Sequence, residues 1–286
     1  MRVPFRLLDV FADAPFTGNQ LCVVSDVPAG LDTEMMLTLA REIAFSETTF
    51  VTAVRHDGYD VRIFTPDNEL PFAGHPTIGT AFALVSDGRV SSSLVQTSAA
   101  GDVPVEVDIA NQSATMHQLP PIFSLPFDDR AAVAAGAGLE LVDLADGLPI
   151  VAVSTGIAHL MVPVRDESTL RRADRNARAC NAVCESADAE SLYLFTVRGE
   201  GDVMARMFDR FMAIGEDPAT GSAAGPLGAY LSQHGLAGMP GRATVAQGEM
   251  VRRPSFLRLD VAPVGDSWSV AVSGNVRLMG EGAFSF

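Results

Sequence analysis

The 286-residue chain contains no lysine, so its cationic groups are 20 arginines, five histidines and the N-terminal amine. A pyridoxal-phosphate enzyme or a Schiff-base aldolase needs a lysine amine, and a Walker-type phosphate loop needs its lysine on the phosphates. The absence of lysine therefore excludes these three classes of protein.

Cysteine is also scarce. Cys22, Cys180 and Cys184 are an odd number in a large chain, which disfavours a disulfide framework and agrees with a reducing compartment. No apolar run reaches the roughly 18 residues of a membrane helix, and the first residues, MRVPFRLLDV, do not form the series typical of a secretory signal. We therefore expect a cytoplasmic protein.

Metal and hydrolase motifs are missing as well. The sequence has no HExxH, no paired CxxC and no Gly-x-Ser-x-Gly elbow. Cys180 and Cys184 lie one helical turn apart, but two soft ligands alone make no site. We expect no metal site of these kinds and no serine hydrolase chemistry.

Acidic residues outnumber basic ones by 35 to 20, which gives a formal net charge of -15. Such a chain repels a phosphate backbone or an anionic lipid surface. Nucleic acid and membranes are therefore not expected as partners.

The predicted strands and helices alternate along the chain, and they form two successive series of similar order. Proline-rich residues 119–129, LPPIFSLPFDD, separate the two series and are the candidate linker, because proline cannot donate to a strand ladder. The pattern predicts strands at 5–10, 21–25, 48–54, 59–64, 103–109, 114–118, 191–197 and 202–208, and a strand–turn–strand at 150–164. It predicts helices after Asp32, at 75–85, at 168–183 and from Gly221.

Two local comparisons indicate a duplication. An Arg-x-Phe at the end of a strand occurs at residues 62–64 and again at 206–208. Each is followed by a loop and by a glycine, Gly74 or Gly221, that opens a helix ending at a glycine fourteen residues later. The Thr-Gly turns in TGNQLCVV and TGIAHLMVPV also correspond. The chain is therefore expected to hold two copies of one βα unit.

Residues 215–230, GEDPATGSAAGPLGAY, form the second of these helix starts and are rich in small side chains. A helix N-terminus has unpaired N–H groups and a partial positive charge, so two such ends facing a shared cleft favour an anion such as a carboxylate. The small residues allow strands to pack closely on a buried helix. Taken alone, the segment is more typical of a closely packed core helix with a serine N-cap, but its repeated placement in both halves favours a binding site.

Three titratable residues stand out near these helices. Glu47 lies between apolar residues where a helix gives way to a strand, and burial there raises a carboxyl pKa towards that of a neutral-pH acid and base. His75 lies at the first helix start, where an imidazole tends to stay neutral. Asp217 lies near the second helix start. Each has a structural alternative, as a capping or solvated residue.

These segments carry a family resemblance. LLDVFADAPFTGNQLCVV, FSETTFV, ELPFAGHPTIGTA, STGIAHLMVPV and above all GEDPATGSAAG resemble the PhzF family of phenazine-biosynthesis isomerases, in family order over almost the whole chain. The resemblance implies an α+β fold of two pseudo-symmetric diaminopimelate-epimerase-like domains, each a curved mixed sheet wrapped around a central helix, with the active site between them. The domains expected are 1–118, joined by 275–286, and 119–274. The family also implies a homodimer.

The related epimerases use two cysteines, and their positions correspond here to Ala73 and Thr220, which cannot exchange a proton usefully. In the PhzF family one glutamate acts as base and acid within a dihydro-hydroxyanthranilate ring, and the resemblance assigns that role to Glu47. Gln20 stands where many relatives have proline. The resemblance further assigns catalytic positions beside Glu47 to His75 and Asp217, and substrate-binding positions to Asn19, Gly74, Gly221 and Ser222.

We therefore expect a cofactor-independent isomerase that shifts a proton within a small carboxylate-bearing substrate. Two alternatives stay open at this point. One is a racemase, epimerase or lyase on the same scaffold, and the other is a noncatalytic protein that binds a small anion.

Overall fold

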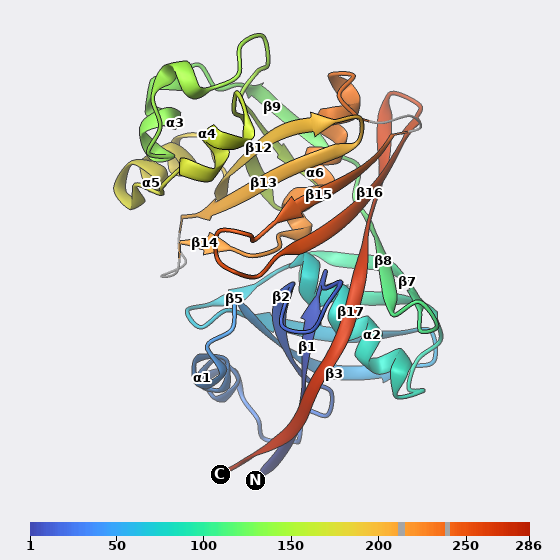
Figure 1. The fold of residues 1–286 in the computed structure, drawn as a ribbon. Coiled ribbons are helices and arrows are strands. Elements are labelled where there is room, and N and C mark those ends of the chain that lie inside the picture. The colour runs from blue at the N-terminus through green and yellow to red at the C-terminus, as the bar shows by residue number, and fades with distance from the viewer. Residues whose placement is uncertain (211–214, 238–240) are drawn as a thin grey trace. The chain divides into compact units, whose positions relative to one another are not determined.

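The computed structural model describes residues 1–210, 215–237 and 241–286. Close contacts divide the chain into two compact units. Unit 1 contains Met1–His117 together with Ser273–Phe286, and unit 2 contains Gln118–Val272. Figure 1 labels their helices and strands.

Unit 1 is a mixed sheet with two helices. Its elements are β1 (Arg2–Val10), β2 (Asn19–Val24), α1 (Thr33–Ile43), β3 (Glu47–Arg55), β4 (Gly58–Phe64), β5 (Glu69–Leu70), α2 (Gly74–Ser86), β6 (Ser93–Ser98), β7 (Gly101–Asp108), β8 (Ser113–Gln118) and the second half of β17 (Ser267–Ser285). The pairs β2–β3 and β4–β6 are parallel, whereas β17–β1, β1–β2, β3–β4, β6–β7 and β7–β8 are antiparallel. Pairing of β17 with β8 closes the sheet.

Helix α2 lies inside this closed sheet and packs on β1, β2, β3, β6 and β7 (Figure 1). All of its residues from Gly74 to Leu84 are buried. Its small residues are needed for that position, because a Cβ on Gly79 would lie only 2.8 Å from Val10 Cγ2 and would also overlap Leu21.

Unit 2 also contains a mixed sheet and a buried helix. Its elements are β9 (Ile122–Pro126), α3 (Arg130–Gly136), the 3-10 turn η1 (Leu141–Asp143), β10 (Val151–Ser154), β11 (Ala158–Pro163), α4 (Glu167–Arg172), α5 (Ala177–Ser186), β12 (Ser191–Gly199), β13 (Asp202–Asp209), β14 (Glu216–Asp217), α6 (Gly221–Gln233), β15 (Arg242–Gln247), β16 (Ser255–Val264) and the first part of β17. The pairs β11–β12 and β13–β15 are parallel, and β9–β10, β10–β11, β12–β13 and β15–β16 are antiparallel.

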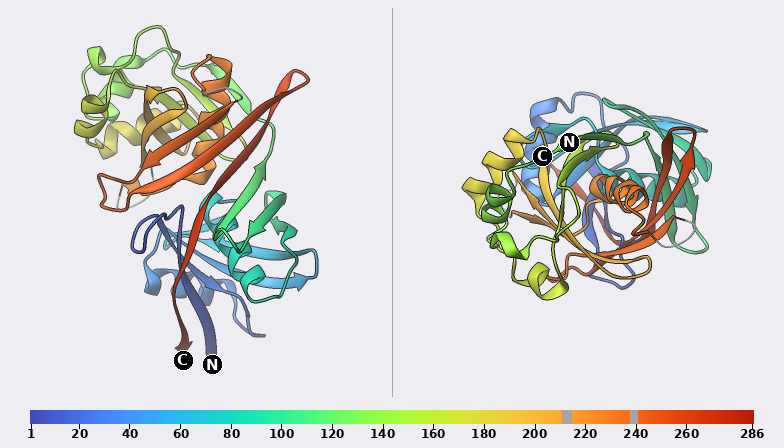
Figure 2. Two further views of the ribbon diagram at one scale, coloured as in Figure 1. Left: turned by 45° about the vertical axis from the view of Figure 1, so that its right-hand side comes forward. Right: turned by 90° about the horizontal axis from the view of Figure 1, so that it is seen from above.

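Helix α6 takes the central position in unit 2, and Figure 2 (right) shows it nearly end-on with strands around it. It packs on β10, β11, β15 and β16, and its residues from Gly221 to Leu231 are buried. A Cβ on Gly228 would lie 2.8 Å from Val261 Cγ2, so the expected close packing of small residues is confirmed.

The order of strand pairings around α2 therefore recurs around α6. The Arg-x-Phe pairs correspond in detail. Arg62 donates through Nε and Nη2 to Glu69, at 2.8 and 2.6 Å, and lies 5.1 Å from the centre of the Phe64 ring. Arg206 binds Glu216 in the same way, at 2.9 and 2.6 Å, and lies 4.9 Å from the centre of the Phe208 ring. Each arginine–glutamate pair joins a long strand to the short antiparallel strand that precedes the central helix, β4 to β5 in unit 1 and β13 to β14 in unit 2. The predicted α+β class is confirmed.

The single helix predicted at 168–183 was wrong, because the structure has two helices there. Arg206 Nη1 donates to the carbonyls of Leu170 and Ala173, at 3.0 and 2.6 Å, which ends α4. Asn176 then begins α5 by accepting from the N–H of Ala179 at 3.2 Å. A side chain distant in sequence thus overrides the helical pattern.

The proline-rich segment at 119–129 is also more than a linker. Residues Ile122–Pro126 form β9, which pairs with β10 on one side and leaves Leu125 87% exposed. Proline is tolerated on an edge strand because the N–H that it lacks there would face solvent. Strand β6 at 93–98 was not predicted either.

Replacing the two equivalent arginines is expected to have unequal effects on stability. Arg206 is 8% exposed, so Arg206→Ala leaves a buried carboxylate and three carbonyls without their donor and costs about 3–5 kcal/mol. Arg62 is 30% exposed, so Arg62→Ala costs about 1 kcal/mol or less. Urea unfolding followed by circular dichroism measures both, and equal losses would contradict this account.

Candidate active site

The two central helices begin without a capping side chain. Ala73 and Thr220 occupy their N-cap positions, and neither makes a side-chain hydrogen bond to the helix. The other described α-helices have such a bond, from Asp32, Asp129, Asp166 and Asn176. The N–H groups at the start of α2 and α6 are therefore not satisfied by the usual capping side chain.

A chain of polar side chains runs through unit 1 to the start of α2. The Ser46 hydroxyl donates to Asn19 Oδ1 at 3.0 Å, and Asn19 Nδ2 lies 3.1 Å from His75 Nδ1. On the other side of the ring, His75 Nε2 lies 3.4 Å from Glu47 Oε2. Asn19 and Glu47 begin the parallel neighbours β2 and β3, and His75 is the second residue of α2. The structure therefore brings together four of the predicted residues, including Gly74 at the helix start.

Burial keeps the His75 ring neutral. His75 is 3% exposed, and its burial lowers its pKa from 6.5 to about 3, against a smaller opposing effect of a hydrogen bond to the Gln20 backbone. Burial therefore favours a neutral imidazole, whereas the expectation from the sequence named the helix end as the cause. Its contact with Glu47 is thus one between a neutral ring and a carboxyl group. The Glu47 side chain is 15% exposed, so it stands at the boundary between the interior and solvent.

The start of α6 in unit 2 is built around a buried glutamine. Gln247 Nε2 donates to the Asp217 carbonyl at 2.8 Å and to Thr220 Oγ1 at 2.9 Å, while Tyr193 donates its hydroxyl to Gln247 Oε1 at 2.8 Å. The Thr220 hydroxyl in turn donates to Asp217 Oδ2 at 2.6 Å. Asp217 is 5% exposed, and these hydrogen bonds hold its side chain and its carbonyl in place. The N-cap residue of α6 is Thr220, not Asp217.

A second polar chain in unit 2 contains a residue that sequence reasoning missed. His159 Nδ1 lies 2.8 Å from Ser191 Oγ, and His159 Nε2 lies 3.1 Å from Ser222 Oγ. The sequence showed no ligand-like neighbours for His159. The signal that was available is its place in TGIAHLMVPV, just after the Thr-Gly turn that corresponds to the one before Asn19.

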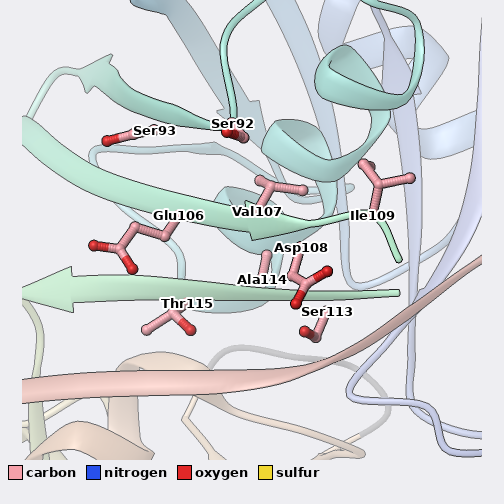
Figure 3. Close-up of a pocket in the computed structure, with 9 residues that line it drawn as sticks. All are labelled: Ser92, Ser93, Glu106, Val107, Asp108, Ile109, Ser113, Ala114 and Thr115. Carbon is pink, nitrogen blue, oxygen red and sulfur yellow. The ribbon is translucent and has the colours of Figure 1, made fainter. Parts of the chain in front are cut away.

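A groove in unit 1 lies away from these residues. It measures about 690 Å³, and Figure 3 shows its lining from β7, β8 and the start of β6. Its lining residues are Ser92, Ser93, Glu106, Val107, Asp108, Ile109, Ser113, Ala114 and Thr115. None of the predicted site residues belongs to it, and Asp108 is engaged by Asn111 within its own turn.

Within residues 1–210, 215–237 and 241–286, no group of three or more His, Cys, Asp or Glu side chains is placed to hold a metal ion. All three cysteines are buried, with free thiols. Burial raises the pKa of Cys22 to about 12, which makes its thiol a poor nucleophile.

Comparisons with known proteins agree with this architecture. Residues 8–282 match the family model PhzC-PhzF, described as phenazine biosynthesis-like protein. A trans-2,3-dihydro-3-hydroxyanthranilate isomerase from Pseudomonas aeruginosa is 34% identical over 97% of this chain and 98% of its own. A crystal structure of a PhzF family protein from Bacillus anthracis matches with a TM-score of 0.88 and 26% identity over the whole of both chains.

The chain belongs to the PhzC-PhzF family of phenazine biosynthesis-like proteins. It is an enzyme of the isomerase class, as its named relatives are. The fold is shared more widely, because a probable proline racemase from Agrobacterium radiobacter matches with a TM-score of 0.71 at 12% identity, over 99% of this chain and 93% of that one. No helix in the described part of the chain is long and apolar enough to span a membrane.

The buried histidines are expected to make stability fall with acid. Burial lowers the pKa of His159 to about 3, as it does for His75, so below pH 6.5 the unfolded state binds more protons than the folded one. The free energy of unfolding therefore falls as the pH drops from about 6.5 towards 3, by up to about 1.4 kcal/mol per pH unit for each histidine.

His159→Gln tests this dependence in unit 2, which contains the single tryptophan, Trp268. Urea unfolding followed by Trp268 fluorescence between pH 4 and pH 7 is expected to show a slope smaller by about one proton in His159→Gln. The wild type, measured in parallel, gives the reference slope. An unchanged slope in His159→Gln would show that His159 is charged in the folded state.

Proposed function

We propose that the chain is a cofactor-independent isomerase that shifts a proton within a small carboxylate-bearing molecule of the dihydro-hydroxyanthranilate type. The observation that supports this most directly is the partly exposed Glu47 carboxyl beside the buried, neutral His75. The Pseudomonas aeruginosa relative, a trans-2,3-dihydro-3-hydroxyanthranilate isomerase, supports the substrate class.

In the proposed reaction, Glu47 acts first as base and then as acid. Its carboxylate takes a proton from one ring carbon, holds it as a carboxylic acid, and returns it to another carbon as the double bond moves. Atoms and charge balance without a co-reactant, because the same proton leaves and returns. A general acid and base of this kind contributes a factor of about 10² to 10⁴ in rate.

His75 is proposed to position Glu47 without adding charge. A cationic imidazole 3.4 Å away would stabilise the carboxylate and make Glu47 a weaker base. A neutral ring offers a hydrogen-bonding partner to the carboxyl group while leaving its basicity largely intact. Asn19 holds the His75 ring through the contact between Asn19 Nδ2 and His75 Nδ1, and Ser46 holds Asn19 by donating to its Oδ1.

The remaining predicted residues are proposed to bind the substrate. Gly74 and Gly221 begin uncapped helices, and their backbone N–H groups suit a carboxylate. Ser222 and Asp217 suit the polar groups of the ring. The recurring strand order further supports the proposal that the units are pseudo-symmetric domains, 1–118 with 275–286 and 119–274.

Ala73 and Thr220 argue against the two-cysteine racemase reaction of related enzymes, since neither side chain titrates near neutral pH.

We also propose a homodimer, as the family resemblance implies, and a cytoplasmic location, which the three free thiols favour. Light scattering at several protein concentrations measures the first, and a dissociation constant in the millimolar range would contradict it.

The proposed reaction is tested with trans-2,3-dihydro-3-hydroxyanthranilate in heavy water, with products followed by mass spectrometry. The wild type is expected to yield an isomer in which the carbon that receives the proton carries mostly the original hydrogen, with deuterium from the solvent in only part of the product. Glu47→Gln is expected to lower kcat by about 10² to 10⁴-fold while leaving substrate binding within a few-fold.

Glu42→Gln is the matched control, because it makes the same chemical change at an exposed helical position five residues away. It should retain full activity. Turnover within threefold of wild type in Glu47→Gln would remove Glu47 from the mechanism. A wild type that binds the compound and leaves it unchanged would favour a noncatalytic binding protein, and inversion at one carbon would favour an epimerase.

A further inference from the structure

Ser191, His159 and Ser222 form a buried series of hydrogen-bonded side chains. The positions of the hydrogen atoms determine the direction in which each hydrogen bond is donated. Ser191 is fully buried and His159 is 2% exposed, so neither can exchange these bonds for water. Ser191 Oγ and His159 Nδ1 are 2.8 Å apart, and His159 Nε2 and Ser222 Oγ are 3.1 Å apart. The neutral ring carries one hydrogen, on one of its two nitrogens.

The Ser191 hydroxyl decides which nitrogen carries that hydrogen. If Nδ1 were protonated, it would donate to Ser191 Oγ, and the Ser191 hydroxyl hydrogen would be buried with no acceptor among the described residues. An unpaired buried donor is costly. If Nδ1 is unprotonated, Ser191 donates to it, and the hydroxyl without an acceptor among the described residues is that of Ser222, which is 7% exposed. The ring hydrogen then lies on Nε2.

This tautomer fixes the role of Ser222. With the hydrogen on Nε2, the 3.1 Å contact makes His159 the donor and Ser222 Oγ the acceptor, so the hydroxyl hydrogen of Ser222 would point elsewhere. Ser222 is the second residue of α6 and is 7% exposed, at a helix start that lacks a capping side chain. With the opposite tautomer, Ser222 would donate inward to His159 and offer only lone pairs, which repel a carboxylate.

Unit 1 contains a chain of the same polarity with a different middle residue. The Ser46 hydroxyl donates to Asn19 Oδ1, and Asn19 Nδ2 faces His75, the second residue of α2. In both units a serine donates to the middle side chain, which presents an N–H to the second residue of the central helix. An amide and an Nε2-protonated imidazole carry acceptor and donor in the same order.

We propose that Ser191 and His159 hold Ser222 as a hydrogen-bond donor toward an anionic group of the substrate. His159 is a positioning residue in this arrangement, and Ser191 selects its tautomer. The assignment of the anionic group as the substrate carboxylate rests on the proposed function.

The tautomer is measured directly by ¹⁵N NMR of protein labelled at histidine, at pH 7 and without ligand. The chain has five histidines, and the signals absent from His159→Gln assign His159. The expected spectrum shows an unprotonated Nδ1 and a protonated Nε2 for this residue. A protonated Nδ1, or a ring charged at pH 7, would overturn the proposal whatever reaction the enzyme performs.

The consequence for binding is measured with trans-2,3-dihydro-3-hydroxyanthranilate as the probe. His159→Leu removes the donor to Ser222, and KM is expected to rise about tenfold with kcat changed less than threefold, because the lost bond acts before and during the reaction. His159→Gln, whose amide keeps an acceptor and a donor, is expected to recover most of the affinity.

Three outcomes separate this proposal from the proposed function. Equal KM values in wild type and His159→Leu would overturn the role of His159 in binding. Equal losses in the Leu and Gln variants would show a purely structural role and overturn it too. If wild type does not turn over the probe, the proposed function fails, and the NMR result still decides the polarity of Ser222.

Discussion

Enclosure of a helix by a sheet is the constraint on which the rest of this structure depends. Helices α2 and α6 are buried over most of their length, so small residues such as Gly79 and Gly228 are required where strands approach them. The same enclosure removes water from the first turn of each helix. Every polar group there has to find a partner in the protein or in a ligand.

The polar chains follow from that requirement. Buried glutamines provide one solution, because Gln96 joins Tyr59 to Thr77 beside α2 and Gln247 joins Tyr193 to Thr220 beside α6. The other solution is a series of side chains that begins with a serine, Ser46 or Ser191, and reaches the second residue of each central helix. In unit 1 the chain continues to Glu47, which the proposal makes the proton carrier. In unit 2 it ends on Ser222, which the proposal makes a binding group.

Much of the fold was predictable because it rests on local patterns. The strands around Glu47, the cap at Asp32 and both central helices follow from alternation, capping residues and glycine positions. The misses have non-local causes. Arg206 reaches from β13 to end α4, and the pairing of β9 with β10 makes a strand out of a proline-rich segment. His159 was missed because its partners lie 32 and 63 residues away.

The central claim is that one carboxyl group carries the proton from one carbon to another. Substrate deuterated at the carbon that loses its proton tests this most directly, with the product of the first turnovers analysed by mass spectrometry in ordinary water. The account predicts that part of the deuterium appears at the new position, because Glu47 keeps what it removes. Product that contains none of the label, even in the first turnover, would contradict it.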